Sequence, residues 1–186
     1  MKIKIIICLT GFITSLSLNA AVFGNYQYEN GYNNIYINAT GKYVDTSNPN
    51  SVNKQLCTDT NARLVPGEVH VISSGTVCRV EWKGRISDNY EFYSLLGSST
   101  IYEWSPITDD NRTSQKNYIL ANGVTNGGLD LGDFVFHCKA IKNTGQIYYG
   151  KYVPGNNKCY FGNFHSALQV QDSYNDYILS VLTAKL

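Results

Sequence analysis

The sequence predicts an all-β protein in which two tandem repeats of short antiparallel strands form one compact, sandwich-like or prism-like domain with pseudo-twofold symmetry. Three observations support this fold class. The 186 residues include 15 Tyr, 7 Phe and 16 Gly but only 16% charged residues, a composition that favours short strands and tight turns. No segment shows the sustained 3.6-residue spacing of an amphipathic helix. Two cysteine pairs, Cys57/Cys78 and Cys138/Cys159, share a spacing of 21 residues, which indicates a duplication.

The N-terminus has the pattern of a secretory signal peptide over residues 1–20. Lys2 and Lys4 form a basic start, Ile5 to Leu18 is apolar apart from Thr and Ser, and small residues follow at the predicted cleavage site. The apolar run is short for a membrane span, and no other run approaches the ~18 residues that a spanning helix needs. We therefore expect a secreted protein, either extracellular or periplasmic, with no membrane span.

Removal of the signal peptide changes the charge and the cysteine count. Loss of Lys2 and Lys4 leaves 13 basic against 14 acidic residues, a net charge of about −1, so electrostatics predict no nucleic-acid or anionic-membrane partner. Loss of Cys8 leaves four cysteines, which in an oxidising compartment predict two disulfides. Three pairings are open. The simplest is Cys57–Cys78 and Cys138–Cys159, one within each repeat.

The first repeat is expected over residues 21–97. Residues 21–31 are rich in Tyr, Asn and Gly and predict a loose lead-in, and Ile35-Tyr36-Ile37 is the first predicted strand. Glu68–Ile72 and Thr76–Trp82 flank Ser73-Ser74-Gly75, which predicts a hairpin. Tyr90–Leu96 is a further strand, and the following Gly97-Ser98-Ser99 marks the boundary between the repeats.

The second repeat is expected over residues 98–186. Asp109–Lys116 is polar and predicted to be exposed. Three β-type runs follow, separated by Asn/Gly turns: Asp133–Ile141, Gln146–Val153 and Lys158–Phe161. Alternation of Tyr177, Leu179 and Val181 predicts a last strand, although Asp172–Ala184 also fits a short helix.

An ordered series of motifs in the second repeat carries the functional prediction. It starts with Asn122-x-Val124-x-x-Gly127-Gly128-x-Asp130, continues with an aromatic strand ending in Cys138-Lys139-Ala140, and closes with Gly150-Lys151, Cys159-Tyr160 and Tyr177-x-Leu179. This series resembles the DM-nine repeat, a repeat usually found in tandem in exported or surface-acting proteins. The resemblance covers residues ~120 to 182 well and ~48 to 96 weakly. Better-understood members of that family resemble mannose-type lectins with an all-β, pseudo-twofold arrangement.

The resemblance implies that Asp130 and Lys151 contact a sugar. Their chemistry suits that role, because a carboxylate accepts hydrogen bonds from sugar hydroxyls and an ammonium donates them. Tyr149 stands where the family has Pro, and Tyr149, Tyr152 and His137 are further candidates near the site. The competing interpretation is that Asp130 only caps a turn and that Lys151 is a solvated charge on an edge strand.

The first repeat is expected to be degenerate. It keeps Pro66-Gly67 but has Glu68 where the family has Lys, and it lacks a Gly-Gly-x-Asp turn before Cys57. The second repeat is therefore the better candidate for a binding site.

These observations predict a secreted carbohydrate-binding protein that recognises mannose-type glycans, for example in host–microbe recognition, without enzymatic activity or a cofactor. His70, His137 and His165 show no spacing typical of a metal site. The sequence does not decide whether the chain forms a homodimer, which would increase avidity.

Two other functions stay open at this point. One is a protein-binding or structural surface module. The other is a glycan hydrolase, which needs two carboxylates at a defined separation. Asp88 with Glu91 and Asp130 with Asp133 are the close pairs that qualify, but neither lies in a catalytic motif.

Overall fold

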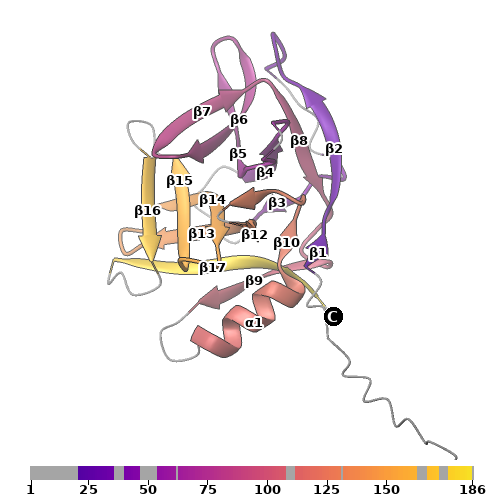
Figure 1. Ribbon diagram of the computed structural model, residues 1–186. Coiled ribbons are helices and arrows are strands. Elements are labelled where there is room, and N and C mark those ends of the chain that lie inside the picture. Colours follow the sequence, from indigo (N-terminus) through magenta and orange to yellow (C-terminus); the bar gives the residue numbers. More distant parts are fainter. Residues whose placement is uncertain are drawn as a thin grey trace, which may run out of the picture.

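The computed structural model describes residues 21–35, 40–46, 54–61, 63–107, 112–130, 132–162, 167–171 and 176–185 (Figure 1). The predicted signal peptide and residues 36 and 37 of the first predicted strand lie outside these ranges. The described residues are almost entirely strands and turns, as the composition predicts, with one helix, α1 (Arg112–Asn122). The all-β fold class is therefore confirmed.

The first of two large antiparallel sheets lies in the upper part of Figure 1. Its strands, in spatial order, are β7 (Arg85–Asn89), β6 (Gly75–Trp82), β5 (Pro66–Ile72), β4 (Lys54–Asp59), β8 (Glu91–Leu96) and β2 (Asn25–Asn30), and β3 (Val44–Asp45) also pairs with β4. The predicted hairpin is present as β5 and β6, and Ile72 lies opposite Gly75 at its turn.

The second sheet lies below the first and is joined to it by close packing of β14 on β5 and of β15 on β6. Its strands, in spatial order, are β16 (Ala167–Gln171), β15 (Lys158–Gly162), β14 (Ile147–Val153), β13 (Phe136–Lys142), β17 (Tyr177–Ala184) and β9 (Tyr102–Ile107). In each sheet the first strand in the chain lies at one edge, the last strand lies beside it, and the other strands follow in chain order. Cys57 lies opposite Gly67 in the first sheet, and Cys138 lies opposite Gly150 in the second. Duplication of the sequence itself stays a prediction.

Both predicted disulfides are present, and each joins two strands across the strand between them. Cys57–Cys78 links β4 to β6 and Cys138–Cys159 links β13 to β15, with Cα–Cα distances of 5.9 and 6.0 Å. Two strand spacings in a flat sheet amount to roughly 9.5 Å, so each sheet bends sharply here. Gly67 and Gly150 permit the bend, because a Cβ on either would lie within 2.1 Å of a carbonyl oxygen on the next strand.

The hydrophobic core connects the two sheets. Leu56 and Leu95 from the first sheet form one buried cluster with Tyr149 and Leu182 from the second. Burial of each leucine side chain contributes about 1.5–3 kcal/mol, so this cluster holds the two sheets together as one unit.

The structure differs from the prediction at two segments. The expected loose lead-in contains β1 (Val22–Phe23) and β2, which pairs with β8 along all six of its residues. Residues 112–116 of the segment expected to be polar and exposed form the first half of α1, a helix that the sequence did not predict. Ile119, in the second half of this helix, is fully buried in the cluster that contains Phe136. In both cases contacts with distant segments decide the local structure, since β2 has few apolar residues and, among residues 114–122 of α1, one side chain is completely buried. The C-terminal segment is the strand β17 and not a helix.

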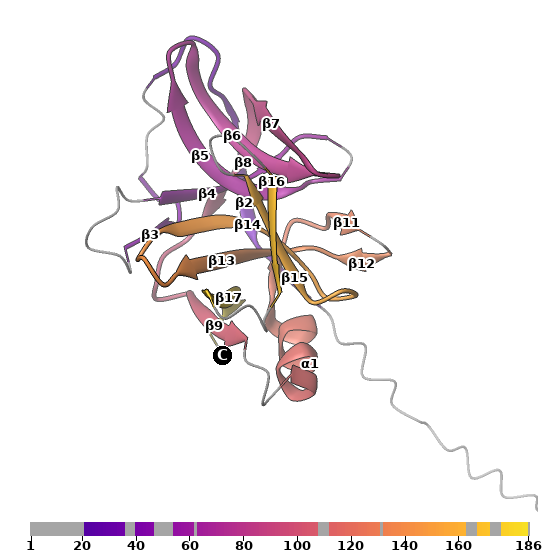
Figure 2. The ribbon, with the colours of Figure 1, turned by 90° about the vertical axis from the view of Figure 1, so that its left-hand side faces the viewer.

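Three short strands position the candidate site. β10 (Val124–Thr125) pairs in parallel with β1, and β11 (Leu129–Asp130) forms a hairpin with β12 (Asp133–Phe134). Figure 2 shows this hairpin projecting from the body of the protein, between the first sheet above and α1 below.

Candidate functional site

The structure brings the two predicted sugar contacts together. The Lys151 ammonium on β14 donates a hydrogen bond to Asp130 Oδ2 on β11 at 3.0 Å. Asp130 therefore engages in an ion pair and does not merely cap its turn. Lys151 lies on a strand between β13 and β15, so the predicted alternative of an edge position is wrong. The role of the pair in ligand binding stays a prediction.

Gly127 and Gly128, which precede Asp130, are each required to be glycine for a different structural reason. Gly127 has a φ of 85°, a left-handed conformation that favours glycine. Gly128 packs directly on the backbone of the loop after β4, because a Cβ there would lie 2.3 Å from the Arg63 carbonyl oxygen and 2.7 Å from that of Leu64. The Gly-Gly-x-Asp turn thus docks against this loop of the N-terminal half of the chain.

A third charged residue, Glu81 on β6, completes the site. Its Oε2 lies 3.6 Å from Lys151 Nζ, and its Oε1 accepts a hydrogen bond from the Gly84 N–H at 2.6 Å. The side chains of Lys151 and Glu81 are 3% and 2% exposed, whereas that of Asp130 is 21% exposed. A buried ammonium requires such partners, since an unpaired buried charge is strongly destabilising. Asp130 is therefore the member of the triad with the most accessible side chain.

Two aromatic rings cover the ammonium. Lys151 Nζ lies 4.0 Å from the ring centroid of Trp82 and 5.2 Å from that of Tyr160, both within the range of cation–π attraction. The Tyr160 hydroxyl accepts a hydrogen bond from Asn156 Nδ2 at 2.6 Å. Burial, together with the Asp130 and Glu81 carboxylates, raises the pKa of Tyr160 and keeps its hydroxyl protonated. Both rings are half-buried, so each retains some accessible surface.

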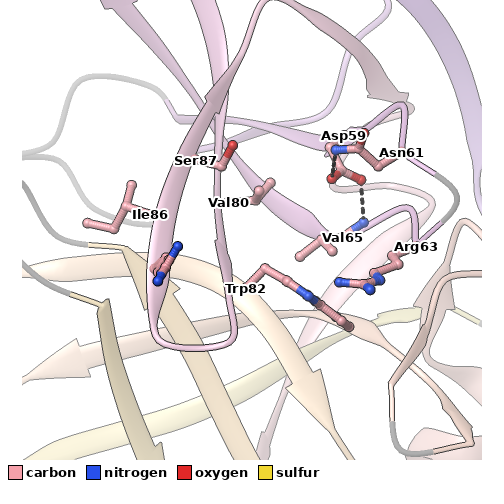
Figure 3. A pocket seen from close by; sticks show the side chains of 9 residues that line it. Asp59, Asn61, Arg63, Val65, Val80, Trp82, Ile86 and Ser87 are labelled. Carbon is pink, nitrogen blue, oxygen red and sulfur yellow. Dashed lines mark hydrogen bonds between the residues drawn. The ribbon is translucent and has the colours of Figure 1, made fainter.

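A pocket of about 560 Å³ is lined by the same tryptophan and by other residues between 59 and 87. Figure 3 shows Trp82 and Val80 between the residues that follow β4 and those of β7. The pocket is lined by Asp59, Asn61, Arg63, Val65, Val80, Trp82, Arg85, Ile86 and Ser87.

The other residues considered from the sequence lie outside the site. Tyr149, Tyr152 and His137 are each no more than 2% exposed, so they are core residues and not sugar contacts. His137 Nε2 lies 2.9 Å from the Tyr26 hydroxyl, and burial lowers the pKa of His137 to about 3, which keeps it neutral. Asp88 forms a bidentate pair with Arg79, with both distances at 2.7 Å, and is thereby committed to a structural contact.

In the expected first repeat, residues 21–97, an acidic residue stands where Lys151 stands in the second. Glu68 follows Gly67 as Lys151 follows Gly150, and it lies 2.5 Å from His70 Nε2 and 3.6 Å from Lys54 Nζ. The side chain expected to be degenerate is thus a buried carboxylate beside an imidazole and an ammonium.

Sequence reasoning missed Glu81 and Trp82 as parts of the site. Glu81 and Trp82 are the last residues of β6, just before the Lys83-Gly84 turn. They lie in the expected first repeat, far along the chain from the Gly-Gly-x-Asp motif. A weak signal exists, because Glu81 lies between Val80 and Trp82 near the end of a strand rich in apolar residues, and a carboxylate buried there needs a cationic partner somewhere in the fold.

Comparisons with known proteins define the fold but no family. No protein-family model matches the chain, and no curated protein matches it. A similar solved structure is that of the nematode sperm cell motility protein MFP2B, with a TM-score of 0.61 and 10% sequence identity over 87% of this chain and 47% of that one. This chain therefore spans about half of that protein's length, and at such low identity the likeness concerns the fold alone. The resemblance to the DM-nine repeat stays a prediction.

In the part of the chain that the structure describes, none of the helices has the length and apolar character needed to cross a membrane.

Proposed function

We propose that this is a secreted carbohydrate-binding protein that recognises mannose-type glycans at the Asp130–Lys151 pair. One observation carries the proposal: two residues from separate motifs converge at 3.0 Å, and the carboxylate of the pair stays accessible. Among the described residues Asp130 Oδ1 has no hydrogen-bond partner, so it is available to accept from a sugar hydroxyl. Lys151, which also lies 3.6 Å from Glu81 Oε2, holds that carboxylate in one orientation.

The surroundings of Asp130 suit a sugar ring. The half-buried ring of Tyr160 lies beside the pair, and such rings pack against the apolar face of a sugar while their polar end stays in water. The signal-peptide pattern and the two disulfides support export to an oxidising compartment, where glycans of cell surfaces are accessible.

Calorimetric titration with methyl α-mannoside, together with a glycan array, tests the proposal. The variant Asp130→Asn keeps the shape of the side chain but removes its charge. Because a hydrogen bond to a charged group contributes about 1.5–3 kcal/mol, we expect at least a ten-fold loss of affinity. The control is Asp176→Asn, an exposed carboxylate beyond the far end of β13. If Asp130→Asn bound every glycan as tightly as the wild type does, the proposed sugar site at Asp130 would be wrong.

A structural or protein-binding role is the competing proposal. The observation that favours it is the burial of Lys151, because an ammonium enclosed by two carboxylates also serves simply to join two sheets. Wild-type protein that binds no glycan on the array while Lys151→Met lowers stability would favour this alternative.

A further inference from the structure

The pocket beside Trp82 has an apolar floor and a polar rim. Val65 and Val80 are buried and form its floor, and Ile86 contributes a half-buried side chain. The rim consists of Asn61, Arg63, Arg85 and Ser87, all of which are exposed (Figure 3). Its volume of about 560 Å³ lies within the range of ~300–1,000 Å³ that is typical of small-molecule sites.

The one carboxylate that lines this pocket, that of Asp59, already accepts two hydrogen bonds from the protein. Asp59 Oδ1 accepts the Val65 N–H at 2.7 Å and Asp59 Oδ2 accepts Asn61 Nδ2 at 2.8 Å. Desolvation by burial raises the pKa of Asp59, although these hydrogen bonds and nearby cations oppose the shift. The carboxylate therefore shapes the loop after β4 and offers little to a ligand.

Hydrogen-bond donors outnumber acceptors around the cavity. Neither Arg63 nor Arg85 forms an ion pair at hydrogen-bond distance with any described residue. The Arg63 guanidinium lies 4.2 Å from the ring centroid of Trp82, which restricts its position. The indole Nε1–H of Trp82 has no acceptor among the described residues, but it is buried from solvent and is therefore not offered to a ligand. The two exposed guanidinium groups make the pocket complementary to an anion.

We propose that this pocket binds a sugar residue that carries a carboxylate, of the uronic or sialic acid type. Arg63 and Arg85 hold the carboxylate, and the floor of Val65, Val80 and Ile86 receives the apolar face of the ring. The inference rests on the proposed function in taking a glycan as the ligand. Trp82 lines this pocket and also contacts the Lys151 ammonium, so an acidic sugar here and a neutral sugar at Asp130 would occupy neighbouring subsites.

The test compares matched monosaccharides by calorimetry: methyl β-glucuronide, the methyl glycoside of N-acetylneuraminic acid, and neutral methyl β-glucoside. We expect one of the two acids to bind at least ten times more tightly than the neutral sugar and to weaken as salt concentration rises. Arg85→Gln should lower that affinity at least five-fold. Lys83→Gln, which removes a nearby charge that does not line the pocket, should change it less than two-fold.

Several results would overturn the inference. These are equal binding of acidic and neutral sugars, equal effects of Arg85→Gln and Lys83→Gln, or competition by inorganic sulfate as strong as that by the acidic sugar. The two proposals fail separately. Mannoside binding that depends on Asp130 without acid binding would refute only this pocket, whereas acid binding that depends on Arg85 without mannoside binding would refute only the Asp130 site.

Discussion

Lys151 on β14 reaches across the interface between the two sheets to Glu81 on β6, with 3.6 Å between Nζ and Oε2, and both side chains are buried. The contact joins the second sheet to the first at the candidate site. A mannoside site at Asp130 and an acid site beside Trp82 would both depend on it, because Lys151 contacts each of these residues.

Replacement of Lys151 by Met should destabilise the protein strongly. Glu81 would be left as a buried carboxylate without its cation, and loss of one partner from a buried pair costs about 3–5 kcal/mol. Urea denaturation followed by tryptophan fluorescence measures the change in unfolding free energy. The double variant Lys151→Met with Glu81→Leu should recover much of the loss, since it removes both charges. The exposed Lys185→Met serves as control, and a loss below about 0.5 kcal/mol in Lys151→Met would contradict the interpretation.

Replacement of Gly128 by Ala should loosen the docking of the β11–β12 hairpin. The added Cβ would meet the carbonyl oxygens of Arg63 and Leu64, both backbone atoms that move only with the loop. Overpacking of this kind costs about 1–3 kcal/mol, and we expect mannoside affinity to fall with stability because Asp130 shifts away from Lys151. Gly145→Ala is the matched control: its φ of 85° costs about 1 kcal/mol, but no atom lies within 4 Å. Similar mannoside affinities in the two variants would argue against a docking role for Gly128.

Stability should decline as pH falls from about 6.5 towards 3, in part because of His137. Burial lowers the pKa of His137 to about 3 in the folded protein, against about 6.5 in the unfolded chain. Between these values the unfolded state binds a proton that the folded state does not, so the stabilisation is complete above 6.5 and is lost on acidification through that window. One such group changes the unfolding free energy by at most ~1.4 kcal/mol per pH unit within this window.

His137→Gln isolates that contribution. The variant will be less stable at pH 7. Between pH 6 and 4, however, its unfolding free energy should depend less steeply on pH than that of the wild type, with a difference in slope equivalent to the binding of up to one proton on unfolding. Parallel pH profiles in the two proteins, or an NMR titration of His137 near pH 6, would show that the ring is not held neutral.

The sequence by itself determined the features that arise from neighbouring residues. Abundant Tyr and Gly and alternating apolar residues predicted strands and turns, and the Ser73-Ser74-Gly75 turn located the β5–β6 hairpin. Equal cysteine spacing predicted both disulfides. Asp130 and Lys151 were selected on a resemblance to a family and not on geometry.

Only the tertiary structure decided what surrounds Lys151. Glu81 and Trp82 lie about 70 residues before Lys151 in the chain, and they reach the ammonium because β6 packs on β15 and β14. The strand β2 and the helix α1 likewise depend on distant partners, namely β8 and the core around Phe136. The physical reason is the same in each case. Hydrogen bonding along a strand and packing across an interface join residues that lie far apart in the chain. The local pattern of side chains does not show which distant residues will pair.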